Sequence, residues 1–233
     1  MKVERAAVLF DVGNTLLHLD YPRMADAVGK ATGRQLPAAA LLAAGYAGRR
    51  AVEEALARGA LTDAQRYPVF VRALLQDAGL APDLIAPAMQ ALRREDRRRS
   101  LYSAVPPGTG EALERLRSAG YVVGAVSNSD GTVADLLTAG GLRDRLAFVI
   151  DSGLVGVEKP DPRIFRLGLT FAGVPATNAW YVGDIYSIDV IGARAAGMEA
   201  ILIDPLGRYG HLDCRTAPDV AAVPELVGLP PTR

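Results

Sequence analysis

The sequence predicts a doubly wound α/β protein, in which a parallel sheet covered by helices carries an inserted all-helical domain. Three observations lead to this prediction: short apolar segments rich in β-branched residues, helical patterns between them, and one long helical stretch without a strand candidate. A chain of 233 residues is long enough for a large core with a smaller insert.

Five segments have the pattern of buried parallel strands, because each is short, apolar and followed by a turn or a polar group. They are 6–10, 122–126, 148–150, 180–182 and 200–203. Helical patterns at 129–140, 162–172 and 189–196 separate the last four, with Pro162 in the first turn of one and Gly197 just after another. This alternation predicts a Rossmann-like sheet with helices on both faces.

The stretch from about residue 21 to residue 99 differs from the rest, because it contains helical patterns alone. Helices are expected at 23–32, 38–58, 62–78 and 82–98, with Thr62 placed to cap the third. We therefore expect a Rossmann-like core of residues 1–17 and 103–215, a helical cap of residues 18–102, and a loosely packed, proline-rich tail of residues 216–233.

Composition narrows the possible chemistry. Lys and Arg total 26 and Asp and Glu total 26, so no excess of positive charge points to nucleic acid or anionic lipid. A single cysteine, Cys214, excludes a disulfide framework and a cysteine zinc cluster, and two histidines exclude a multi-histidine metal site. There is no 18-residue apolar run and no signal-peptide layout, so we expect a cytoplasmic protein without a membrane or nucleic-acid partner.

Reactive side chains follow the predicted strands, at the edge where open parallel sheets bind ligands. The first strand runs into Asp11-Val12-Gly13-Asn14-Thr15, the second into Ser127-Asn128 and the fourth into Gly183-Asp184, with Asp189 five residues on. Lys159 lies in the loop before the helix at 162, and it is one of three lysines in a chain with 23 arginines. A lysine retained in such a chain suggests a need for its compact ammonium.

These blocks, in this order, resemble the haloacid dehalogenase-like hydrolase superfamily: a strand ending in Asp, a later strand ending in Ser or Thr, a Lys, and an acidic pair. The stretch from Gly183 to Met198 is similar to the fourth motif of that family, and the helical insert is similar to its helical cap. The resemblance covers about residues 6 to 205. It implies a Mg²⁺-dependent phosphatase acting on a small phosphorylated metabolite, with the cap closing over the site to exclude water.

The resemblance also implies a role for each residue. Asp11 would be the nucleophile that forms an aspartyl-phosphate, with Ser127 and Lys159 completing the catalytic set. Mg²⁺ would be held by Asp11, the carbonyl of Gly13 and Asp184, with Asp189 either direct or through water. The residues implied to bind the phosphoryl group or the substrate are Asn14, Thr15, Ser127, Asn128 and Lys159.

Several of these residues also fit a purely local role. Thr15 fits substrate binding and capping of the following turn equally well, and Asn14 fits a hydrogen bond to the loop backbone or to the substrate. Ser127 and Asn128 could satisfy nearby backbone groups. Residue type alone does not choose between these roles.

One position departs from the family pattern. Most phosphatases of the superfamily carry a second Asp two residues after the nucleophile, as general acid and base, whereas this chain has Gly13 there. Because glycine has no proton to transfer, we expect slow turnover of alkyl phosphate esters and a smaller effect on aryl or anomeric phosphates.

The same residues are also compatible with other functions. A haloacid dehalogenase or a phosphonatase also lacks the second Asp, although a dehalogenase usually lacks the acidic pair, and Lys30 is a poor candidate for the cap lysine of a phosphonatase. A different class is a non-hydrolytic regulatory or phosphate-binding protein that lost turnover through Gly13. The long helical insert disfavours a receiver-type signalling domain. Apolar faces on the cap helices leave a homodimer open, and no cap residue identifies the substrate.

Overall fold

The computed structural model describes residues 6–59 and 61–231 of the chain. Residues 1–5, 60 and 232–233, which fall in the expected core, cap and tail respectively, lie outside the described residues. The chain divides into two compact units, one made of Met1–His18 with Val105–Arg233 and the other of Leu19–Ala104.

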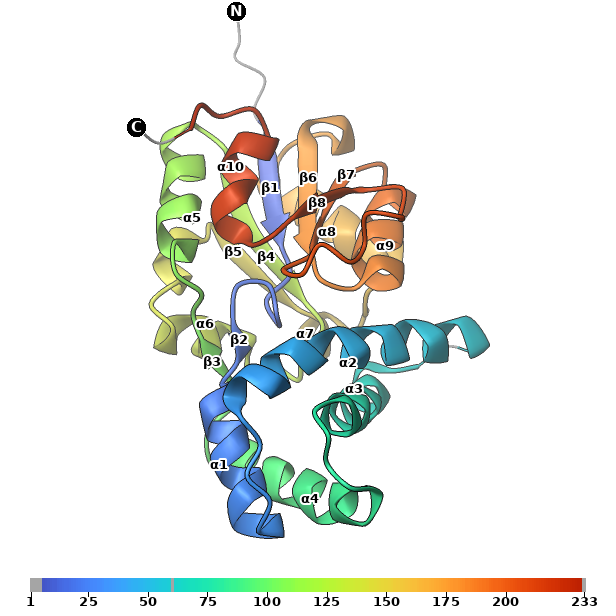
Figure 1. Ribbon diagram of the computed structural model, residues 1–233. Coiled ribbons are helices and arrows are strands. Elements are labelled where there is room, and N and C mark those ends of the chain that lie inside the picture. Colours follow the sequence, from blue (N-terminus) through green and yellow to red (C-terminus); the bar gives the residue numbers. More distant parts are fainter. Residues whose placement is uncertain (1–5, 60, 232–233) are drawn as a thin grey trace, which may run out of the picture. The chain divides into compact units, whose positions relative to one another are not determined.

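The first unit is built on a six-stranded parallel sheet in the order β5-β4-β1-β6-β7-β8 (Figure 1). The strands are β1 (Ala7–Phe10), β4 (Val122–Ser127), β5 (Phe148–Asp151), β6 (Ala179–Gly183), β7 (Glu199–Ile203) and β8 (Arg215–Ala217). From β1 the sheet grows through β4 to β5, and the chain then returns to place β6 on the other side of β1. This reversal is the switch point at which open parallel sheets bind ligands.

The helices of the first unit connect these strands. They are α5 (Thr109–Ser118), α6 (Val133–Ala139), α7 (Ser152–Val155), α8 (Pro162–Ala172), α9 (Ile191–Ala195) and α10 (Val223–Leu226). Helix α5 packs on β4 and α10, whereas α8 packs on β1, β4 and α9. Because right-handed crossovers that run in opposite directions along a sheet place their helices on opposite faces, both faces are covered. The predicted doubly wound α/β fold is confirmed.

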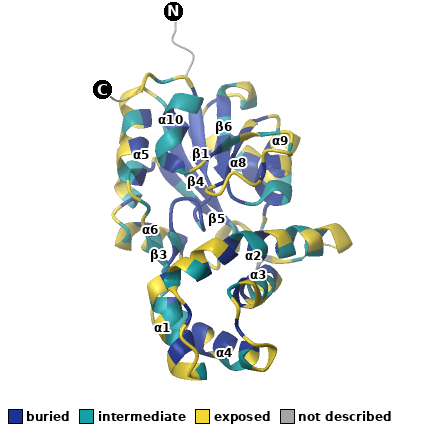
Figure 2. Cartoon of the chain, in the orientation of Figure 1, coloured by how far each residue is buried: buried dark blue, intermediate teal, exposed yellow. Residues whose placement is uncertain are grey.

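Helix α8 fixes the loop that precedes it. Asp161 caps the helix by accepting a hydrogen bond from the backbone N–H of Arg163, and Gly173, at φ 67°, ends it. The helix lies close to the sheet, because a Cβ on Gly168 would come within 2.8 Å of Leu9 Cδ1. Strands β1, β4 and β6 lie in the buried interior of this unit (Figure 2), and all four residues of β1 are fully buried.

The sequence pattern does not predict helix α5 or strand β8, nor the short helices α7 and α10. Helix α5 begins directly after Gly108, its N-cap residue, whose φ of 78° suits glycine and which ends a Pro-Pro-Gly sequence that is typical of a loop. The tail expected from residue 216 is not loose where it is described. Strand β8 pairs in parallel with β7, and its Ala217 is buried, as are Val220 and Val223 beyond it.

The second unit is helical, as the sequence predicts. Its helices are α1 (Tyr21–Thr32), α2 (Ala38–Arg58), α3 (Asp63–Asp77) and α4 (Pro82–Arg98). Helix α2 packs along α3, and α1 packs against α4. Strands β2 (His18–Leu19) and β3 (Tyr102–Ala104) pair where the chain enters and leaves the unit. In the part of the chain that the structure describes, no helix combines the length and apolarity needed to cross a bilayer.

The guanidinium of Arg23 joins the two ends of the helical unit. It donates hydrogen bonds to the carbonyls of Arg99 and Ser100, each at 3.0 Å, and to Glu95 Oε1 at 2.8 Å. The backbone N–H of Arg23 donates to Asp20 Oδ1, which caps α1. The start of α1 and the end of α4 are therefore held together beside β2 and β3.

Candidate active site

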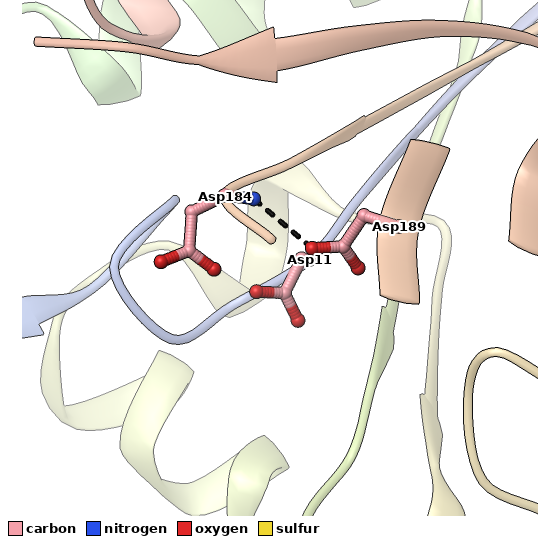
Figure 3. A group of neighbouring side chains, drawn as sticks. All are labelled: Asp11, Asp184 and Asp189. Carbon is pink, nitrogen blue, oxygen red and sulfur yellow. Dashed lines mark hydrogen bonds between the residues drawn. The ribbon is translucent and has the colours of Figure 1, made fainter. Parts of the chain in front are cut away.

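The strand ends bring three acidic residues together. Strands β1 and β6 run in parallel with Phe10 beside Val182, so Asp11 and Asp184 follow neighbouring strands at the same edge. Figure 3 shows the carboxyl groups of Asp11, Asp184 and Asp189 gathered there, and one oxygen from each lies within 4.8 Å of the others. Their exposed fractions are 7%, 4% and 1%. Buried carboxylates at this spacing are costly unless a cation accompanies them.

Lys159 supplies one positive charge to this cluster. Its ammonium donates to Asp11 Oδ1 and to Asp189 Oδ1, both at 2.7 Å. Burial lowers the pKa of Lys159, but the two carboxylates raise it well above its usual value, so the side chain is charged. Burial raises the pKa of Asp11 to about 6, against the opposing effect of Lys159. With all three carboxylates ionised, the cluster keeps two negative charges in excess, which matches one divalent cation.

Both carboxylate oxygens of Asp189 have hydrogen-bond partners. Oδ1 accepts from Lys159, and Oδ2 accepts from the backbone N–H groups of Asp184 and Ile185, each at 3.0 Å. A regular helix is predicted from residue 189, but a wide π-type turn, Tyr186–Val190, precedes α9 instead. This turn brings the Asp189 carboxylate back onto the amides at the end of β6.

The loop after β1 folds back tightly on itself. The carbonyl of Val12 accepts backbone hydrogen bonds from Leu16 and Leu17, and the N–H of Asn14 donates to the carbonyl of Leu17. Asn14 has a φ of 52°, in the left-handed region that asparagine adopts more readily than most residues. The Thr15 hydroxyl is buried and has no hydrogen-bond partner within the described structure, so the capping alternative for Thr15 is not observed.

Ser127 and Asn128 lie at the end of β4. The hydroxyl of Ser127, which is 4% exposed, donates to the carbonyl of Asn128 at 3.4 Å. The Asn128 side chain accepts from the backbone N–H of Lys159 at 2.8 Å and donates to its carbonyl at 3.0 Å. This side chain therefore positions the Lys159 backbone, and the phosphate contact predicted for Asn128 would have to come from its own backbone N–H.

Tyr181 is a site residue that the sequence patterns miss. Its phenol is fully buried in β6, accepts a hydrogen bond from Lys159 Nζ at 2.9 Å and donates one to the carbonyl of Val126 at 2.7 Å. The sequence does contain a signal for this role, because a tyrosine in a buried central strand needs a hydrogen-bond partner for its hydroxyl. The surrounding apolar run, Trp-Tyr-Val-Gly, is nevertheless indistinguishable from ordinary core sequence.

A parallel sheet with an acidic cluster and a buried lysine at its switch point is typical of an α/β hydrolytic enzyme. Residues 6–197 match the model of the haloacid dehalogenase-like hydrolase family. The chain belongs to this family, and it is a hydrolase. The family resemblance predicted from the order of the four sequence blocks is confirmed.

Three known proteins illustrate the similarity. A phosphoserine phosphatase of Thermus thermophilus is 39% identical over 143 residues, which cover 60% of this chain and 54% of that protein, so the match spans about half of that relative. A ribulose-1,5-bisphosphate 5-phosphatase of Halopiger xanaduensis is 33% identical over 85% of this chain and 84% of its own length. The crystal structure of a HAD phosphatase from Thermococcus onnurineus matches at a TM-score of 0.60 and 26% identity, covering 96% of this chain and 98% of that one.

Gly183 is required for the close approach of Asp189 to β6. A Cβ at this position would lie 2.3 Å from Asp189 Cγ, so the carboxylate or the strand would have to move. We expect Gly183→Ala to lower the free energy of unfolding by about 1–3 kcal/mol, measured by chemical denaturation. Gly210→Ala is the matched control, because Gly210 is exposed and no atom beyond its own residue and its two chain neighbours lies within 4 Å of an added Cβ. Equal losses in the two variants would contradict this explanation.

Proposed function

We propose that this protein is a Mg²⁺-dependent phosphatase that hydrolyses a small phosphorylated metabolite through an aspartyl-phosphate on Asp11. The observation that supports it best is the buried cluster of three carboxylates around the ammonium of Lys159. Two relatives named as phosphatases support the type of reaction, and one of them is named for a sugar bisphosphate, which supports a small phosphorylated substrate.

The donor set fits a magnesium ion. Mg²⁺ prefers oxygen ligands and is usually held by one or two carboxylates together with water and phosphate oxygens. Asp11 and Asp184, with the carbonyl of Gly13, would hold it. We assign Asp189 to contact through water, because its two oxygens already accept from Lys159 and from two backbone N–H groups. When bound, the ion offsets negative charge on the phosphoryl oxygens and orients the phosphate.

Asp11 carries the covalent chemistry in this proposal. One of its carboxylate oxygens forms a bond to phosphorus as the bond from phosphorus to the leaving oxygen breaks. The leaving oxygen takes its proton from water, because Gly13 provides none. A second water then attacks the phosphorus atom of the aspartyl-phosphate, which releases inorganic phosphate and restores the carboxylate of Asp11.

The remaining predicted residues would bind the phosphoryl group. Lys159 holds the Asp11 carboxylate in place and offsets the charge that gathers on the phosphoryl oxygens. The hydroxyls of Ser127 and Thr15 would donate to those oxygens, and the buried Thr15 hydroxyl supports this, since the described structure gives it no internal partner. Asn14 and the backbone N–H of Asn128 would complete the binding site.

The proposed function is tested by assaying a panel of phosphate esters with Mg²⁺. We expect Asp11→Asn to lower kcat by at least about 1,000-fold, because an amide cannot act as the nucleophile. Asp135→Asn, which changes an exposed carboxylate on α6, is the control and should retain full activity. Turnover that survives Asp11→Asn would contradict the covalent route. Phosphate binding without turnover of any ester in the unaltered protein would support the non-hydrolytic regulatory alternative.

The glycine at position 13 leads to a separate prediction about protonation of the leaving group. Gly13 is not among the described residues that have a left-handed backbone, so its φ does not exclude a residue with a side chain. We expect Gly13→Asp to raise kcat on an alkyl phosphate by about 10- to 100-fold and to change kcat on 4-nitrophenyl phosphate far less, because only the alkoxide needs a proton.

Gly13→Asn is the matched control, since its amide has a similar size but no acidic proton. It should give no gain on the alkyl phosphate. An equal increase in kcat for Gly13→Asn and Gly13→Asp, or equal increases on alkyl and aryl esters, would contradict this prediction. The missing proton donor at position 13 would then not be what limits the rate.

A further inference from the structure

The ammonium of Lys159 donates hydrogen bonds to acceptors from three different side chains. Two are the carboxylates of Asp11 and Asp189, each at 2.7 Å, and the third is the phenol oxygen of Tyr181 at 2.9 Å. An ammonium has three N–H donors, so it can donate to all three of these acceptors at once. Two acceptors are charged side chains on segments that follow strands, whereas the third is neutral and lies within central strand β6.

The phenol oxygen of Tyr181 is held in place by its own contacts. Its O–H donates to the carbonyl of Val126 at 2.7 Å, which directs an oxygen lone pair toward the ammonium of Lys159. The ring packs edge-on against Phe165 of α8, with the ring centroids 4.8 Å apart at an interplanar angle of 74°. The side chain is fully buried. The acceptor offered to Lys159 is therefore fixed by both β4 and α8.

The two charged acceptors do not stay equivalent during the proposed reaction. When Asp11 bonds to phosphorus, its carboxylate becomes an uncharged acyl group. The leaving oxygen takes the negative charge that Asp11 loses, and the phosphoryl oxygens keep their own negative charge. The attraction of Asp11 for Lys159 then falls, and Asp189 alone would draw the ammonium toward itself. A neutral acceptor whose position does not change would hold the ammonium where the phosphoryl oxygens can still use its charge.

We propose that Tyr181 is a positioning residue that keeps the ammonium of Lys159 between Asp11 and Asp189 throughout phosphoryl transfer. Its catalytic consequence rests on the proposed phosphatase function, whereas its effect on Lys159 does not. Asn128 holds the backbone of the same lysine through two hydrogen bonds, so Lys159 is fixed at both its backbone and its charged end.

The test removes only the hydroxyl. In Tyr181→Phe the ring can keep its contact with Phe165, so the variant should fold with a lower melting temperature. We expect kcat on phosphate esters to fall about 10-fold while KM changes less than about 2-fold. Tyr121→Phe is the matched control, because the Tyr121 hydroxyl also donates to a backbone carbonyl, that of Val227 at 2.8 Å, away from the site. Equal kcat values for the two variants would overturn the proposal.

A second readout does not depend on turnover. The chain has three lysines, Lys2, Lys30 and Lys159, so labelling the lysine side-chain nitrogens gives three ammonium signals by NMR, which Lys2→Arg and Lys30→Arg assign. With Mg²⁺ present, we expect the Lys159 ammonium protons to exchange with water at least about 10-fold faster in Tyr181→Phe than in the unaltered protein or Tyr121→Phe.

The two readouts separate the two proposals. Unchanged exchange at Lys159 in Tyr181→Phe would overturn the positioning role whether or not an ester is hydrolysed. Faster exchange in Tyr181→Phe, together with no turnover of any phosphate ester by the unaltered protein, would support the positioning role and overturn the phosphatase function.

Discussion

The ion pairs of Lys159 with Asp11 and Asp189 are the interaction on which the site depends. Three carboxylates gathered in a buried volume repel one another and lose their hydration, and a single ammonium compensates only part of that cost. In the proposed function, this uncompensated negative charge would attract the divalent ion. The repulsion among these carboxylates opposes folding, and a bound cation would relieve it. Charged groups buried at functional sites commonly have this effect.

The parallel sheet brings these charged side chains together. Because β1 and β6 are neighbours at the switch point, Asp11 and Asp184 emerge side by side, and the π-type turn after β6 returns Asp189 to the same place. Glycine at position 183 leaves room for that return. Lys159 comes from the loop before α8, a helix that packs on β1 and β4, and the Asn128 side chain at the end of β4 holds the Lys159 backbone. Strands β1, β4 and β6 and helix α8 therefore all contribute to the position of Lys159.

The sequence predicts the fold well because buried parallel strands and proline- and glycine-bounded helices leave strong local signals, as at 7–10 and 162–172. It predicts which residues gather because the carboxyl ends of parallel strands meet at one edge. It does not predict β8, whose three residues read Arg-Thr-Ala, or the roles of Tyr181 and Asn128, which depend on contacts with Lys159 from distant parts of the chain. Periodicity reports which face of an element is buried, and it carries no information on hydrogen bonds across the sheet.

A crystal structure with Mg²⁺ and beryllofluoride, which mimics a phosphoryl group on a carboxylate, tests the central claim most directly. We expect beryllium bonded to a carboxylate oxygen of Asp11, the ion on Asp11 and Asp184, and the ammonium of Lys159 still against Tyr181. Beryllofluoride on another side chain, or an ion bound away from the three carboxylates, would contradict it.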